Sequence, residues 1–463
     1  MHFINTAKIC RGMENYGDFP TEKEIVKSTI HIAWPSVLES FAINLAGMVD
    51  MVMVGKLGTA SIAAVSLTNQ PKFLVLAPFL ALNVATASIV ARRKGEENQE
   101  SAIRLLKMVL AITVVLTLVM TVLAVIFAEN ILLMVGAKED TIGSAVDYFK
   151  IIMFGNIFNT IQLVINGAQK GIGNMRIPMA TNIIANVINV ILNYLLIEGH
   201  FGFPAWGVKG AAIATVVGTV FSCILSIVSV LRRDSYLNMK VIKGWVADKL
   251  SRDSFVKVGV STLAEQLCIR IGFMLFAITV ANLGTIEVAA HQIGMNMMSL
   301  SFSIGDGLSA AAVTLIGQSL GAKRPDMAKI FGSVCQRIGL CCAAVISIVY
   351  SLFGRQIYSI VDSSPQVLDY GVTIMRILSI ILFLQIEQVV QFGCLRGAGD
   401  TKFTALVSLI SITLIRPGMA ALFVYPLGMG LIGAWIGTTL DQIVRFILSY
   451  VRFKKGKWIG LKL

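Results

Sequence analysis

Residues 108–128 read MVLAITVVLTLVMTVLAVIFA, a run that contains no charged side chain. About 20 apolar residues in a helix cross the roughly 30 Å hydrocarbon layer of a bilayer, and a helix satisfies its own backbone polar groups there. Comparable runs recur along the chain. They predict about twelve membrane-spanning helices, at residues 28–54, 62–91, 104–128, 144–166, 175–197, 208–231, 254–281, 288–319, 330–353, 367–394, 403–425 and 430–451.

The composition and the placement of charge support a membrane location. The chain is 56% apolar and 14% charged, whereas soluble domains carry about 25% charged residues. The net charge of +13 could suggest nucleic acid, but the basic residues gather in alternate connections, as the positive-inside rule requires. We therefore expect no nucleic-acid partner, and a multi-pass protein of the cell membrane with both termini in the cytoplasm. The connection after the sixth helix is the most basic, with Arg232, Arg233, Lys240, Lys243, Lys249 and Arg252.

Several other protein classes are not supported by the sequence. Residues 1–27 are polar and of mixed charge, so we expect a short cytoplasmic segment and no cleavable signal peptide. The seven cysteines show no paired metal-ligand spacing, and we interpret them as packing residues. The sequence contains neither a His-Glu-x-x-His pair nor a phosphate-binding Gly-x-x-x-x-Gly-Lys-Ser/Thr loop. We therefore expect a protein without a cofactor, and neither an ATP-driven pump nor a zinc protease.

An internal repeat with an offset of 226 residues organises the chain. Leu57-Gly58-Thr59 aligns with Leu283-Gly284-Thr285, and the glycine-rich run 167–173 aligns with 393–399. The fold prediction is an all-α integral membrane protein with two pseudo-twofold-related six-helix lobes. Secondary transporters use such duplications to place a binding cleft between two moving lobes. The expected parts are a cytoplasmic segment 1–27, an N-lobe 28–232, a cytoplasmic linker 233–252, a C-lobe 253–452 and a basic cytoplasmic tail 453–463.

Carboxylates in the first predicted helix need a physical account. A charge at the bilayer centre costs at least ~2.5–3.5 kcal/mol. Glu39 and Asp50 are eleven residues apart, which is about three helical turns, so both lie on one face. We expect this face to point into the bundle. The alternative for Asp50, which lies near the outer end of the helix, is a solvated carboxylate at a helix end.

Four asparagines form a stripe along the fifth predicted helix. Asn182, Asn186, Asn189 and Asn193 recur at helical spacing in an otherwise apolar segment. We interpret the first two as interhelical hydrogen-bonding groups. The last two lie near the depth expected for Asp50. Together with the hydroxyl of Thr215, their amide oxygens could complete a site for a hard monovalent cation such as sodium.

Polar residues of the second half are arranged differently. Glu265, the repeat partner of Glu39, lies on the seventh predicted helix, and Gln385 and Glu387 lie on the tenth. Glu39, Glu265, Gln385 and Glu387 are candidates for contact with the substrate or a second cation. The alternative for Glu265 is a structural ion pair with Arg270. We expect Arg416 to balance a nearby carboxylate or a helix end.

Several motifs together resemble the multidrug and toxic compound extrusion (MATE) family, and the resemblance covers nearly the whole chain. They are Pro35 with Val49-Asp50 and Val54-Gly55, Gly210-Ala211-Ala212-x-Ala214-Thr215, Ala289-Ala290-His291-Gln292, Gly317-Gln318-x-x-Gly321-Ala322 and Leu395-Arg396-Gly397-x-Gly399-Asp400-Thr401. The resemblance implies two lobes, alternating access, and export of cationic or amphipathic drugs in exchange for sodium ions or protons.

The resemblance also implies roles for individual residues. Asp50, Asn189 and Thr215 match the N-lobe cation site of prokaryotic members, whereas Asn193 stands where many members have aspartate. Glu265 matches a helix 7 carboxylate, and Gln385 aligns with its usual acidic partner. We expect a monomer in contact with membrane lipid. The alternatives are a flippase for lipid-linked sugars or cell-wall precursors, and a non-transporting membrane receptor or scaffold.

Overall fold

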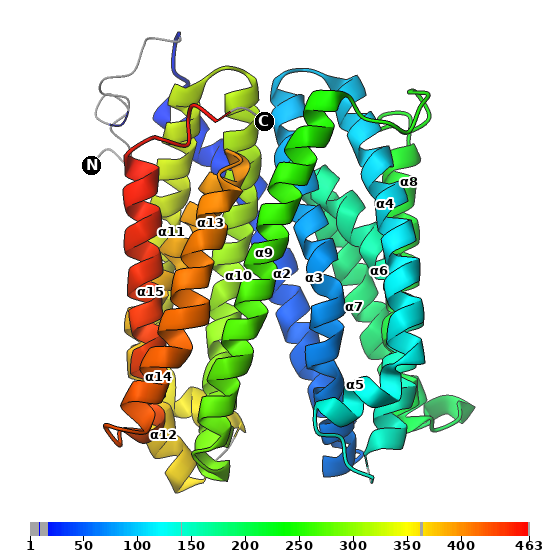
Figure 1. The fold of residues 1–463 in the computed structure, drawn as a ribbon, viewed down its shortest axis with the longest axis vertical. Coiled ribbons are helices and arrows are strands. Elements are labelled where there is room, and N and C mark those ends of the chain that lie inside the picture. The colour runs from blue at the N-terminus through cyan, green and yellow to red at the C-terminus, as the bar shows by residue number, and fades with distance from the viewer. Residues whose placement is uncertain (1–8, 10–16, 140, 362–363, 462–463) are drawn as a thin grey trace. The chain divides into compact units, whose positions relative to one another are not determined.

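The computed structural model describes residue 9 and residues 17–139, 141–361 and 364–461 (Figure 1). Within these residues, twelve helices are long and apolar enough to cross a membrane, which confirms the predicted class. The helices are α2 (Glu22–Gly55), α3 (Thr59–Gly95), α4 (Gln99–Ile126), α5 (Ala128–Met134), α6 (Ile142–Gly171), α7 (Arg176–Ile197), η1 (His200–Gly202), α8 (Gly207–Leu231), α9 (Lys249–Ala281), α10 (Thr285–Gly321), α11 (Pro325–Val361), α12 (Pro365–Gly397), α13 (Thr401–Ser408), η2 (Leu409–Ile415), α14 (Arg416–Val424) and α15 (Gly430–Lys454).

The observed helices extend beyond most predicted spans because polar residues continue the helix past the apolar run. The clearest case is α11, which ends at Val361 although the apolar run suggested residue 353. The segment predicted as one helix at 403–425 contains α13, the π-helical turn η2 and α14. Pro417 follows this turn and has no N–H to donate, and proline is a common cause of irregular helix geometry.

The chain divides into two compact units, which are described separately. The N-terminal unit is Leu38–Val256, and the C-terminal unit is Met1–Val37 with Lys257–Leu463. The predicted linker at 233–252 therefore groups with the N-terminal unit, and the first part of α2 groups with the C-terminal unit. Cys10 and most of the predicted segment 1–27 lie outside the described residues, as does the end of the basic tail, residues 462–463.

Each unit is organised around one central helix. In the N-terminal unit α6 packs against α3, α4 and α8, and in the C-terminal unit α12 packs against α10, α11 and α15. The repeated glycines explain the closest crossings. A Cβ on Gly171 would lie 2.6 Å from the carbonyl oxygen of Ala87, and a Cβ on Gly397 would lie 2.6 Å from that of Val313. These glycines are therefore packing residues that let helices approach closely.

Two further repeated glycines lie directly before helices. Gly58 and Gly284 precede α3 and α10 with φ of 103° and 144°, a region that side-chain-bearing residues rarely adopt. The duplication thus preserves both the helix crossings and the turns.

Half of the described cysteines are buried, in agreement with the predicted packing role for those three. Cys223, Cys335 and Cys394 are buried, while Cys341 is exposed. Among the described residues, no group of three or more His, Cys, Asp or Glu side chains could hold a metal ion.

Candidate functional site

Asp50 lies on α2 in the N-terminal unit, where the asparagine stripe of α7 meets it. The amide nitrogen of Asn193 donates to Asp50 Oδ1 at 2.6 Å. Asn189 lies between Asp50 and Thr215. With its nitrogen toward Asp50, the Asn189 amide donates at 2.7 and 3.2 Å to the two carboxylate oxygens, and its oxygen accepts from the Thr215 hydroxyl at 3.1 Å.

The structure therefore brings the four predicted residues of the N-terminal site together. Asn189 and Asn193 are buried, and Asp50 is half-buried, so the alternative of a fully solvated carboxylate does not describe it. The Oδ1 atom of Asn193 is buried and has no hydrogen-bond partner among the described residues. The site thus contains a carboxylate, two amides, a hydroxyl and one unused oxygen acceptor.

Sequence reasoning missed Lys72 and Tyr148 at this site. Lys72 on α3 interacts electrostatically with Asp50, and its Nζ lies 5.5 Å from the ring centre of Phe73. Tyr148 on α6 is 7% exposed and also interacts electrostatically with Asp50. Lys72 is the only charged residue between positions 61 and 91, and this isolation in an apolar span was the available signal.

Glu39 belongs to a separate polar cluster of the same unit. Its Oε1 accepts from Asn182 Nδ2 at 2.7 Å and lies 3.0 Å from Lys170 Nζ. Asn182 in turn accepts from Gln162 Nε2 at 2.7 Å. Asn182 therefore links α2, α6 and α7, in agreement with the predicted role in interhelical hydrogen bonding. Because Lys170 neutralises Glu39, this carboxylate is not an uncompensated charge.

Glu265 is fully buried in the C-terminal unit and is also neutralised. It forms an ion pair with Arg396 of α12, and its Oε2 accepts from the Thr404 hydroxyl at 2.8 Å. Arg270 lies five residues further along α9, about 140° around the helix axis. The basic partner of Glu265 in this ion pair, Arg396, thus comes from a helix that is distant in the sequence.

Gln385 and Glu387 are both buried on α12. Within the described part of the chain, the Oε1 atoms of both side chains have no hydrogen-bond partner. A Cβ on Gly339 would lie 3.3 Å from Glu387 Oε1, so this carboxylate faces α11. No basic side chain of the described residues lies within ion-pair distance of Glu387, which distinguishes it from Glu39 and Glu265.

Arg416 balances a carboxylate, as expected, and that carboxylate is Asp441. Both are almost fully buried, and Asp441 Oδ2 lies 2.7 Å from Arg416 Nη2 and 2.7 Å from Arg445 Nη2. Asp441 lies inside the last predicted span, where sequence reasoning did not identify it. Its position one helical turn before Arg445 was the available signal.

Comparisons with known proteins agree with this architecture. The MatE family model matches residues 35–195 and again residues 262–422, so it matches each half of the internal repeat. The chain is 28% identical over 448 residues to a probable multidrug resistance protein NorM of Thermotoga maritima, covering 96% of both chains. It is 27% identical over 394 residues to the multidrug resistance protein PmpM of Pseudomonas aeruginosa, covering 83% of this chain and 81% of that protein.

Solved structures share the fold at low sequence identity. The outward-facing conformation of a multidrug resistance MATE family transporter of the MOP superfamily superposes with a TM-score of 0.85 and 20% identity, covering 94% of this chain and 97% of that one. A MOP superfamily transporter from Pyrococcus furiosus gives a TM-score of 0.85 at 21% identity, with 93% and 95% covered. With the family model matching most of its length, the chain belongs to the MatE family of multidrug efflux transporters and is a multi-pass membrane transporter, not an enzyme.

Proposed function

We propose that this protein is a secondary active antiporter that exports cationic or amphipathic drugs in exchange for protons by alternating access. The observation that carries the proposal is the half-buried Asp50 carboxylate, held by the amides of Asn193 and Asn189. The names of the relatives support drug export, since both NorM and PmpM are described as multidrug resistance proteins. We place both termini in the cytoplasm on the basis of the positive-inside pattern.

The donor arrangement around Asp50 favours a proton over sodium. A sodium ion needs several oxygen ligands to replace its hydration shell. The Asn193 nitrogen points at Asp50, and the hydrogen bonds of Asn189 are best satisfied when its nitrogen also points at Asp50. Both amides would have to turn before their oxygens could bind a cation at the carboxylate. A proton binds to one carboxylate oxygen and requires no further ligands.

Lys72 supports the same choice. Its ammonium group already provides positive charge near Asp50. A sodium ion would have to enter beside this ammonium group, and Asn193 offers an oxygen without the second negative charge of an aspartate. The fully oxygen-coordinated sodium site implied by the family resemblance therefore has weak support in this chain.

Protonation of Asp50 provides a physical route to coupling. It weakens the charge-assisted hydrogen bonds from α7 and removes the attraction to Lys72 on α3. A transporter conformation that separates these helices would then bind the proton more tightly than one that holds them together. A ligand that distinguishes two conformations in this way shifts the equilibrium between them.

Glu387 is the candidate for contact with a cationic substrate or a second coupling ion in the C-terminal unit. It is buried, and its Oε1 has no hydrogen-bond partner among the residues that the structure describes. Glu265 and Glu39 are weaker candidates because Arg396 and Lys170 neutralise them.

Purified protein in liposomes tests the proposal. Efflux of a fluorescent cationic dye is measured with a pH gradient alone and with a sodium gradient alone. We expect the pH gradient to drive efflux and the sodium gradient to have little effect. Efflux that follows sodium and ignores pH would refute proton coupling, and the absence of flux under both gradients would refute the antiporter itself.

Two variants identify the site in the same assay. Asp50→Asn should abolish efflux, because it removes the carboxylate that exchanges a proton. Asp234→Asn, which neutralises an exposed carboxylate in the linker, is the matched control and should transport like the wild type. Equal loss in both variants would indicate damage unrelated to the site.

A further inference from the structure

The connection between α8 and α9 is held firmly against the N-terminal unit. Lys107 Nζ of α4 donates to the carbonyl oxygen of Ile242 at 2.7 Å, and Gln99 Nε2 donates to that of Tyr236 at 2.8 Å. The Nζ of Lys94 lies 3.7 Å from the centre of the Tyr236 ring. These contacts fix the backbone of the linker at two points.

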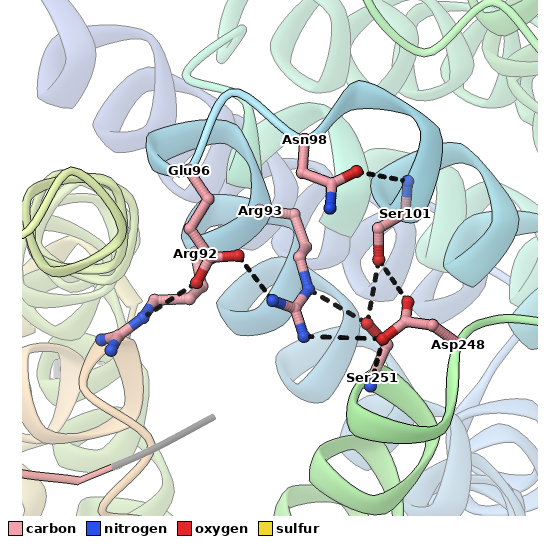
Figure 2. Close-up of polar contacts among 7 residues, drawn as sticks. All are labelled: Arg92, Arg93, Glu96, Asn98, Ser101, Asp248 and Ser251. Carbon is pink, nitrogen blue, oxygen red and sulfur yellow. Dashed lines mark hydrogen bonds and ion pairs between the residues drawn. The ribbon is translucent and has the colours of Figure 1, made fainter.

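A third attachment holds the C-terminal end of the linker (Figure 2). Ser101 Oγ donates to Asp248 Oδ1 at 2.5 Å, and Arg93 Nε donates to Ser251 Oγ at 3.0 Å. The backbone N–H of Ser251 donates to Asp248 Oδ2 at 3.0 Å. Partial burial raises the pKa of Asp248, but the hydrogen bonds from Ser101 and Ser251 and the charge of Arg93 outweigh it and lower this pKa below its ordinary value. Asp248 therefore stays ionised and attached at neutral pH.

The fixed linker nevertheless exposes large apolar side chains. Val241, Trp245, Val246 and Leu250 have exposed fractions of 65%, 57%, 63% and 54%. Lys107 Nζ lies 5.5 Å from the centre of the Trp245 ring, within the range of a cation–π contact. An exposed apolar group of this kind on an anchored segment indicates a binding surface.

Basic residues surround these apolar side chains. Lys240, Lys243, Lys249 and Arg252 are all exposed. Residues 240–253 contain two carboxylates, of which Asp248 is engaged with Ser101 and Ser251, and Asp253 is exposed. The surface therefore combines a positive charge with an indole and aliphatic groups.

We propose that this linker face, formed by Lys240, Val241, Lys243, Trp245, Val246 and Lys249, binds the headgroup region of anionic phospholipids. The linker joins the ends of two membrane-spanning helices, α8 at Leu231 and α9 at Lys249, and we therefore expect it at the level of the headgroups. Tryptophan is enriched at this level. Lysines close to a membrane surface are attracted to anionic lipid, and each contributes about fivefold to binding, since about 1 kcal/mol is gained per basic residue.

Fluorescence quenching by brominated lipids tests the proposal. The full-length protein is placed in nanodiscs of phosphatidylcholine that contain an equal fraction of either brominated phosphatidylglycerol or brominated phosphatidylcholine. Subtracting the signal of Trp245→Phe isolates quenching at Trp245. We expect phosphatidylglycerol to quench Trp245 more strongly, with an apparent preference of about a hundredfold if each of the three lysines contributes about fivefold. The preference should fall at 1 M salt, where screening acts over about 3 Å.

A matched pair of triple variants separates local binding from general attraction. Lys240→Gln with Lys243→Gln and Lys249→Gln should remove the preference. Lys454→Gln with Lys455→Gln and Lys457→Gln removes the same charge from other exposed positions and should retain it. Thermal unfolding in detergent checks that both proteins are folded.

Three outcomes would overturn the proposal. Equal quenching by the two lipids would indicate apolar contact without headgroup selection. No quenching by either lipid would place Trp245 outside the bilayer, as expected for a surface that binds another protein. An equal loss of preference in both triple variants would indicate attraction by net charge alone. Each outcome leaves the dye-efflux test of the proposed antiporter unaffected.

Discussion

Replacement of Asp50 by asparagine, alone and together with Lys72→Gln, separates a coupling role from a structural one. Asp50→Asn keeps the side-chain shape but weakens the hydrogen bonds from Asn193 and Asn189. Hydrogen bonds to charged groups contribute about 1.5–3 kcal/mol and neutral ones about 0.5–1.5 kcal/mol, so about 1 kcal/mol is lost for each of the two amides. The same change leaves the half-buried ammonium of Lys72 without its carboxylate, which adds a further cost.

The burial of a carboxylate is relieved at the same time, and this offsets part of the loss. We therefore expect Asp50→Asn to lower the free energy of unfolding by about 1–2 kcal/mol. Adding Lys72→Gln removes the uncompensated ammonium group and should return the stability to within about 1 kcal/mol of the wild type. Transport should not return, because no carboxylate remains at this site to exchange the coupling proton.

Thermal unfolding in detergent and pH-driven dye efflux from liposomes provide the two measurements. Lys56→Gln is the control for the loss of one lysine, since Lys56 is exposed and lies 3.3 Å from Glu198 in a surface ion pair. Efflux at the wild-type rate in the double variant would refute the reasoning. Asp50 would then serve only as the counter-ion of Lys72.

Three further predictions follow from the charges and contacts of individual residues. Asn193→Asp should introduce sodium-dependent efflux, because it adds negative charge and an oxygen beside Asp50; unchanged ion dependence would contradict the charge argument. Asp441→Asn should lower the stability by about 3–5 kcal/mol, because it leaves two buried arginines uncompensated; a melting temperature like that of the wild type would contradict this prediction. Glu387→Gln should reduce efflux without loss of stability, whereas Glu265→Gln should lower the melting temperature, because it removes the buried carboxylate that forms an ion pair with Arg396. The reverse pattern would exchange the roles of the two glutamates.

The expected effects differ because some of these carboxylates form close ion pairs and others do not. Glu39 and Glu265 occupy equivalent positions in the repeat, and each is neutralised by a basic residue of its own unit, Lys170 or Arg396. Asp50 and Glu387 have no ion pair of this closeness among the described residues. Neutralising Glu39 or Glu265 leaves a base at ion-pair distance uncompensated. Neutralising Asp50 leaves the more loosely associated Lys72 without its carboxylate, and neutralising Glu387 leaves no base of the described residues uncompensated.

The sequence by itself determined the membrane class, the number of spans and the duplication. Apolar runs specify spanning helices because the hydrocarbon layer demands length and apolarity from a single continuous segment. It also determined which residues of α7 face Asp50, since Asn189 and Asn193 lie one turn apart and their common face follows from helical periodicity. The resemblance to the MATE family then agreed with the family model that matches both halves.

Only the tertiary structure decided which charges meet. Lys72 of α3 interacts electrostatically with Asp50, Arg396 of α12 pairs with Glu265, and Asp441 of α15 binds Arg416. Each partner comes from a different helix, and helical periodicity gives a residue's face without giving the identity of the neighbouring helix. The attachment of the linker through Arg93, Ser101 and Asp248 was likewise beyond prediction, because it joins positions about 150 residues apart. The local pattern therefore fixes what crosses the membrane, and the packing of helices decides which buried carboxylates remain available for ions and substrate.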